Sequence, residues 1–232
     1  MAFEDYDQYE QGEQVRKWIR ENGIAVVVGV VLALALIFGW RQWQAHRAGH
    51  HAEAAEQYSV LEAALSSGQD AKVDAAVNAL EKDFGDTPYA ALGAAARANV
   101  AVGQGKLDEA HKALQWAVDH SPTAALHAMY QLRLARVELA QNQAREALAL
   151  LDSLPNGAYR ATAQELRGDA LLKLGRDGDA RSAYANALAA LSATAAPGLR
   201  NALQMKLDNI AQAGTPAAAS AATTTPPGKQ GT

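Results

Sequence analysis

Residues 105–122 read GKLDEAHKALQWAVDHSP, and this stretch decides the fold. Gly105 stands five residues before the small Ala110, and the larger Leu114 follows four residues after that alanine. Glycine suits the positive φ angle at which one helix ends before the next begins. Alanine lets two helices cross closely, and the residue one helical turn later fills the space beside it. The stretch therefore predicts a turn, followed by a helix that packs closely on its predecessor.

The same arrangement recurs along the chain. Residues 142–147 read NQAREA and residues 175–180 read GRDGDA, and each places Asn or Gly five positions before an alanine. A fainter copy surrounds an earlier alanine, and the four alanines are spaced 34, 37 and 33 residues apart (Ala76, Ala110, Ala147 and Ala180). A period near 34 residues is typical of tetratricopeptide repeats, whose helix–turn–helix units stack into a solenoid. The sequence therefore predicts an all-α fold with a tetratricopeptide-like solenoid.

The positions of the helices follow from this repeat. Alanine and leucine are frequent throughout the repeats, and both favour helix. We expect helix pairs at roughly 70–102, 107–140, 144–174 and 177–192, and then a helix over 199–211 that caps the solenoid. Residues 213–232 are small, polar and rich in proline, and this composition predicts a disordered tail.

An uncharged apolar segment lies near the N-terminus. Residues 24–40 read IAVVVGVVLALALIFGW. As a helix this run would span roughly 26 Å, close to the ~30 Å hydrocarbon core of a bilayer. Tryptophans flank it on both sides, as in the aromatic belts of membrane helices (Trp18, Trp40 and Trp43). We expect a cytoplasmic segment over 1–22, a transmembrane helix over 23–43 and the tetratricopeptide-like domain over 44–212.

A cleaved signal peptide is the alternative interpretation of this segment. Signal peptides have a basic start and a cleavage site of small residues after the apolar run. Here the leader contains six acidic residues, and residues 39–43 read GWRQW, which is bulky and basic. An uncleaved anchor is therefore the favoured interpretation. Three basic residues precede the segment and two follow it, which favours a cytoplasmic N-terminus (Arg16, Lys17 and Arg20; Arg41 and Arg47).

Small residues recur on one side of the predicted membrane helix. Ala25, Gly29 and Ala33 stand four residues apart. This spacing lets a second membrane helix approach closely, so the three residues are candidates for helix–helix packing. Small residues are also common in membrane helices that have no such partner, and this alternative stays open.

Composition argues against several classes of function. The formal net charge of −4 gives no electrostatic basis for binding nucleic acid. The chain has no cysteine, which excludes a disulfide framework, a thiol nucleophile and a cysteine-ligated zinc site. His46 and His50 stand four residues apart, as two metal ligands on one helix face would, but no third ligand is evident. We therefore expect no cofactor or metal and no enzyme, with a metal-dependent enzyme as the alternative hypothesis.

A tetratricopeptide solenoid has a concave face lined by the first helix of each pair, and this face is the expected binding surface. In the repeat phase described above, four polar residues would point into it (Asn99, Arg136, Asp169 and Lys173). A solvated groove without a ligand is the alternative. Ala95 stands one turn before Asn99, where a basic clamp for a terminal carboxylate would need a cation, so no such clamp is expected.

Several motifs resemble those of a known family. The N-terminal region contains Glu21-Asn22-Gly23, Gly29-Val30 and Gly39-Trp40-Arg41, followed by Trp43 and His46. Residues 132–137 (LRLARV), 166–171 (LRGDAL) and 178–184 (GDARSAY), with Met205, Lys206 and Asn209, continue the likeness. Together these motifs resemble the YfgM family, over about residues 8–211. The Ala-, Thr- and Pro-rich tail after Gly214 departs from the family pattern.

The resemblance implies more than the repeat does. Members of that family are ancillary, chaperone-like subunits of the bacterial Sec translocon, with the N-terminus in the cytoplasm and the repeat domain in the periplasm. They associate with the SecY–SecE–SecG channel and with the membrane-anchored periplasmic chaperone PpiD, and they are thought to help newly translocated proteins. The resemblance therefore implies a non-enzymatic translocon subunit in the bacterial inner membrane. An adaptor of another cell-envelope complex is the alternative.

Overall fold

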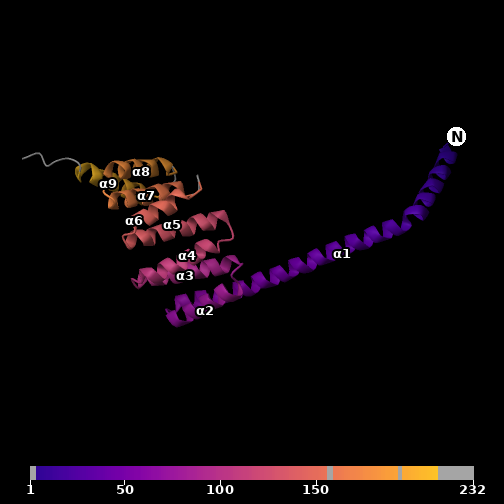
Figure 1. Ribbon diagram of the computed structural model, residues 1–232, viewed down its shortest axis with the longest axis horizontal. Helices are drawn as coiled ribbons and strands as arrows, with labels where there is room; N and C mark the ends of the chain where they lie inside the picture. Colours follow the sequence, from indigo (N-terminus) through magenta and orange to yellow (C-terminus); the bar gives the residue numbers. More distant parts are fainter. Residues whose placement is uncertain (1–3, 156–158, 193–194, 214–232) are drawn as a thin grey trace, which may run out of the picture. The chain divides into compact units, whose positions relative to one another are not determined.

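The computed structural model describes residues 4–155, 159–192 and 195–213, and every regular element among these residues is an α-helix (Figure 1). The chain divides into two compact units, Met1–Gln57 and Tyr58–Thr232. The first unit contains most of α1 (Glu4–Ser66), and the last residues of α1 belong to the second unit. The predicted tail over 213–232 lies outside the described residues except for Ala213, which ends the last helix.

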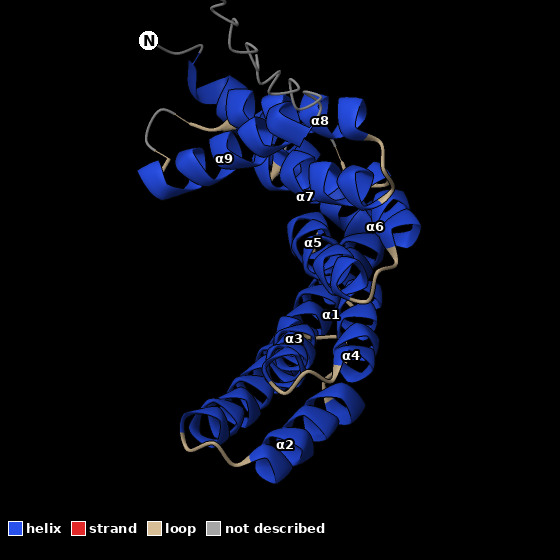
Figure 2. Ribbon diagram, turned by 90° about the vertical axis from the view of Figure 1, so that its left-hand side faces the viewer, coloured by secondary structure: helices blue, strands red, loops and turns tan. Residues whose placement is uncertain are grey.

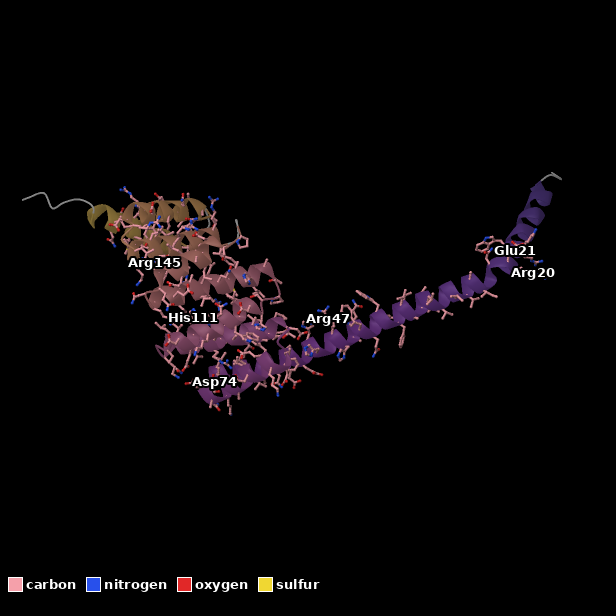
Figure 3. All side chains as sticks on the ribbon, viewed as in Figure 1. Arg20, Glu21, Arg47, Asp74, His111 and Arg145 are labelled. Carbon is pink, nitrogen blue, oxygen red and sulfur yellow. The ribbon has the colours of Figure 1, made fainter. Side chains whose placement is uncertain are left out.

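The apolar segment forms part of α1. Within the described ranges, α1 is the one helix long and apolar enough to cross a membrane, and none of its most apolar window is buried. Figure 3 shows Arg20 and Glu21 near one end of this segment and Arg47 beyond the other. The guanidinium of Arg47 lies 4.8 Å from the ring centroid of Trp43, which in turn lies 5.1 Å from that of Trp40. A helix that is apolar on all sides and has no protein cover is suited to lipid.

The second unit is a stack of short helices. Each helix packs against the next along the chain from α2 onward, and α5 also packs against α7. The helices are α2 (Asp70–Asp83), α3 (Pro88–Gly103), α4 (Leu107–Asp119), α5 (Ala124–Ala140), α6 (Ala144–Asp152), α7 (Arg160–Lys173), α8 (Asp177–Ala190) and α9 (Pro197–Ala213). The helix pairs predicted over 70–102, 107–140 and 144–174 and the closing helix are confirmed to within a few residues, whereas the region 177–192, predicted as a pair, contains the single helix α8.

The turns that end the first helix of each repeat have one shared geometry. Gly68, Gly105, Asn142 and Gly175 have φ angles of 64°, 73°, 63° and 71°. In each turn, the amide of the next residue donates to the carbonyl five residues back, at 2.8–3.1 Å. This is the Schellman arrangement, which satisfies helix-end carbonyls and favours Gly or Asn at the left-handed position. The sequence predicted this conformation at Gly105, Asn142 and Gly175, and the structure confirms it.

Small residues hold the stacked helices close together. The repeat alanines Ala110, Ala147 and Ala180 are fully buried, and Ala76 is nearly so. Figure 2 shows α3, α5 and α7 along the inner side of an arc, with α4, α6 and α8 along its outer side. The first helix of each repeat therefore lines the concave side, as the repeat phase predicted.

Candidate protein-binding groove

The concave side contains a pocket between α3 and α5, which we call the α3–α5 pocket. It has a volume of about 400 Å³ and is mostly apolar, with an amide and two guanidinium groups among its lining (Ala98, Asn99, Val102, Leu107, Leu114, Arg133, Arg136, Val137 and Ala140). Two successive turns of α5 contribute Arg133, Arg136 and Ala140 to one wall, because residues three and four apart share a helix face. The predicted residues Asn99 and Arg136 thus line one pocket.

A second pocket, which we call the α5–α7 pocket, lies on the other side of Arg136. It has a volume of about 550 Å³ (Arg136, Leu139, Ala140, Glu165, Leu166, Asp169, Leu172, Lys173 and Lys206). The structure therefore brings three of the four predicted groove residues to this pocket. Arg136 and Ala140 line both pockets, so the two form one continuous groove along α5.

The polar side chains of the α5–α7 pocket are held by internal partners. Asp169 accepts a hydrogen bond from the Tyr184 hydroxyl at 2.6 Å and contacts the Lys206 ammonium at 2.7 Å. Lys206 also contacts Glu165 at 2.8 Å, and Lys173 donates to the side-chain oxygen of Asn142 at 2.8 Å. Asp169 and Lys173 therefore support the wall of this pocket.

Charge and burial in this cluster shift two pKa values. Burial, with the hydrogen bond to Asp169, raises the pKa of the Tyr184 hydroxyl, so this group stays protonated and donates. Burial lowers the pKa of Lys206, but its hydrogen bonds to Asp169 and Glu165 outweigh that effect and raise the pKa overall. The cluster is thus a charged lysine between two carboxylates at neutral pH.

The α3–α5 pocket differs because its two arginines have no such partners. In the described part of the chain, neither Arg133 nor Arg136 has a carboxylate oxygen within 4.0 Å, whereas Arg97 pairs with Glu81 at 3.2 Å. Asn99 and Arg136 are exposed, and Arg133 is half-buried. Sequence reasoning missed Arg133, although its position one turn before Arg136 is a signal that could have found it. It also missed Lys206, which no local pattern connects to α7.

The other predicted residues lie on α1. Ala25, Gly29 and Ala33 are exposed, and no protein atom lies within 4 Å of the site where a side chain would begin at Gly29. Their role in helix packing stays a prediction. Among the residues that the structure describes, no group of three or more His, Asp or Glu side chains is arranged to hold a metal ion.

Comparison with known proteins agrees with this architecture. The sequence model of a tetratricopeptide repeat-like domain family matches residues 16–212. The Escherichia coli (strain K12) protein named ancillary SecYEG translocon subunit is 32% identical over 201 residues, which cover 87% of this chain and 95% of that protein. This chain belongs to the YfgM family. A second YfgM relative, the Haemophilus influenzae protein that is also named ancillary SecYEG translocon subunit, is 28% identical. The match covers 75% of this chain and 85% of that protein.

One solved structure supports the fold alone. A crystal structure of nearly identical tetratricopeptide-like repeats, from a kinesin light chain of Podospora anserina, superimposes with a TM-score of 0.57. The two are 20% identical, and the match covers 71% of this chain and 87% of that one. The YfgM solenoid therefore has the tetratricopeptide architecture that its 34-residue period predicted.

Proposed function

We propose that this chain is an ancillary subunit of the SecYEG translocon, which tethers a tetratricopeptide-like domain to the membrane through one helix. The extent of the family match carries the proposal, because it runs from residue 16 to residue 212 and so includes both the apolar segment and the solenoid. The named translocon subunits are also matched over most of their own length, up to 95%.

In this proposal residues 23–43 cross the bacterial inner membrane, residues 1–22 lie in the cytoplasm and residues 44–212 lie in the periplasm. The uncovered apolar surface of α1 supports the span. The excess of basic residues before the segment supports the orientation. Ala25, Gly29 and Ala33 form the face on which a neighbouring membrane helix packs.

The concave groove is the protein-binding surface. Its pockets combine apolar walls with a few polar groups, which is the usual composition of a binding site. Its occupants are the periplasmic chaperone PpiD or newly translocated chains. The role is chaperone-like and non-enzymatic, and Asn99, Arg136, Asp169 and Lys173 belong to the binding surface.

Affinity purification of the tagged full-length chain in a mild detergent tests this function. We expect to recover SecY, SecE and SecG, together with PpiD. A matched variant in which Ala25, Gly29 and Ala33 are replaced by leucine should remain in the membrane but recover less of the channel, because larger side chains prevent close helix approach. Recovery of neither the channel nor PpiD contradicts the proposal, and recovery of another cell-envelope complex instead supports the adaptor alternative.

A further inference from the structure

The charge distribution within the groove distinguishes its two pockets. In the α5–α7 pocket, Lys206 neutralises Glu165 and Asp169 at 2.7–2.8 Å. In the α3–α5 pocket, among the residues that the structure describes, no acidic side chain is within ion-pair distance of Arg133 or Arg136. This pocket therefore presents two positive charges to whatever enters it.

These two arginines belong to a chain whose formal net charge is −4. Three other arginines of the solenoid each have a carboxylate partner (Arg97 with Glu81, Arg167 with Asp152 and Arg176 with Asp179). Acidic residues can thus pair with arginines in this fold, yet among the described residues no carboxylate oxygen lies within 4.0 Å of the pair on α5. Like charges one helical turn apart repel each other, and this pair lacks the internal compensation that Arg97, Arg167 and Arg176 have.

The walls around the arginines are apolar. Val102 is 46% exposed although it lines the pocket, and Leu107, Leu114 and Val137 line it with Val102. Apolar walls beside an arginine reduce the solvent screening of its charge and so strengthen its attraction to a carboxylate. Guanidinium groups bind carboxylates with paired hydrogen bonds, which a lysine does not provide.

From this geometry we propose that the α3–α5 pocket binds a protein segment in which an Asp or Glu side chain is flanked by apolar side chains. The carboxylate bridges Arg133 and Arg136, while an apolar neighbour contacts Val102 and Val137. The apolar lining fits a peptide better than a nucleic acid or a free anion, neither of which has side chains to place there. This inference rests on the proposed role of the groove as a protein-binding surface and names the chemical class of its ligand.

The test is a binding measurement on the full-length chain in lipid nanodiscs, with empty nanodiscs as the blank. The probes are two fluorescent peptides of about ten residues, enough to span the groove when extended. One peptide alternates leucine with aspartate, and the other replaces each aspartate by asparagine. We expect the aspartate peptide to bind about tenfold more tightly at low salt, as for a hydrogen bond between charged groups. The preference should shrink as salt is added.

Substitutions then show which residues cause the preference for the aspartate peptide. The double variant R133Q/R136Q should bind both peptides equally, and the single variant Arg136→Glu, at an exposed position, should favour the asparagine peptide. Arg145→Gln is the matched control, because Arg145 (Figure 3) is an exposed arginine on α6 that lines neither pocket, and it should keep the full preference. Circular dichroism of each variant confirms that it is folded.

Three results would overturn the inference. They are equal binding of both peptides to the unaltered chain, a preference that survives in both groove variants, and a preference lost in Arg145→Gln. None of them bears on recovery of the Sec channel, which depends on α1. Failure of this inference is therefore distinguishable from failure of the proposed function.

Discussion

At the scale of single residues, the contact between Gly168 and Tyr184 fixes how α7 and α8 pack. A side-chain carbon built at Gly168 would overlap the ring of Tyr184, closer than real contacts reach. Tyr184 cannot move aside freely, since it is 1% exposed and its hydroxyl donates to Asp169 at 2.6 Å. Only glycine therefore fits at this crossing.

Gly168→Ala is expected to lower the free energy of unfolding by about 3 kcal/mol, because the methyl group overpacks a closely fitted site. Denaturant unfolding of the full-length protein measures the change. Gly178→Ala on α8 is the control: nothing lies within 4 Å of its added carbon, so it should cost nothing. Equal effects of the two substitutions would show that the crossing is looser than described.

A buried carboxylate, Glu138, gives the solenoid a pH dependence. Glu138 is 6% exposed, one of its oxygens lies 3.5 Å from the His111 imidazole, and the other has no hydrogen-bond partner among the described residues. Burial raises the pKa of Glu138 above its ordinary value of 4.5, and His111 offsets this effect only in part. Because ionisation is less favourable in the folded state, it costs stability once the pH exceeds the unfolded pKa, and the full cost is reached above the folded pKa.

Glu138→Gln removes this cost, since glutamine carries no charge. At pH 7 the variant should be more stable than the parent, because its neutral amide avoids the cost of ionising a buried group. The advantage should disappear as the pH falls below 4.5, where the parent glutamate is also neutral. Unfolding measured from pH 4 to pH 7, with the exposed Glu109→Gln as control, tests this prediction. A variant less stable than its parent throughout would show that the contact with His111 outweighs the cost of burial.

At the scale of elements, α9 closes the solenoid through both apolar and charged contacts. Leu203 and Ile210 are buried in one cluster with Leu171 of α7 and Tyr184 of α8. Lys206 adds the contacts with Glu165 and Asp169, which are 41 and 37 residues away in sequence. An open solenoid end needs such a cap, because its last helix pair would otherwise expose apolar surface.

Lys206→Met keeps the length of the side chain but leaves two acidic side chains of α7 without their cation. We expect a loss of stability of about 1 kcal/mol, since the pair is partly exposed. Hydrogen exchange of the α9 amides should accelerate more than exchange in α3. Arg200→Met on the same helix is the control, because the hydrogen bond that Arg200 donates to the Ser192 carbonyl is long, at 3.4 Å. Unchanged protection of α9 in the lysine variant would mean that the apolar contacts alone hold the cap.

The elements show how far the sequence predicts this fold. Each repeat encodes its own turn and its own small crossing residue, so the left-handed positions at Gly105 and Asn142 could be predicted from local chemistry. The contacts of Lys206 could not, because they depend on where α9 docks after folding. The same holds for Arg133: its position on the helix face is predictable, but its lack of an acidic neighbour depends on which helices pack around it.

At the scale of the whole molecule, α1 and the solenoid differ in how much of their apolar surface is buried. In the described part of the chain, none of the most apolar window of α1 is buried, which suits a bilayer, whereas the solenoid buries apolar residues within its own repeats. We propose that the membrane helix recruits the chain to the translocon and that the concave groove binds protein. The central claim is that the groove, rather than the outer side of the solenoid, meets the partner protein.

Site-specific photo-crosslinking in living cells tests this claim most directly. A photoreactive side chain replaces Asn99, which lines the α3–α5 pocket, or Arg145, which is exposed on α6 and lines neither pocket of the groove. We expect crosslinks from position 99 to PpiD or to a newly translocated chain, and few crosslinks to these proteins from position 145. Crosslinks that are equally strong from both positions, or that come from position 145 alone, would contradict the claim.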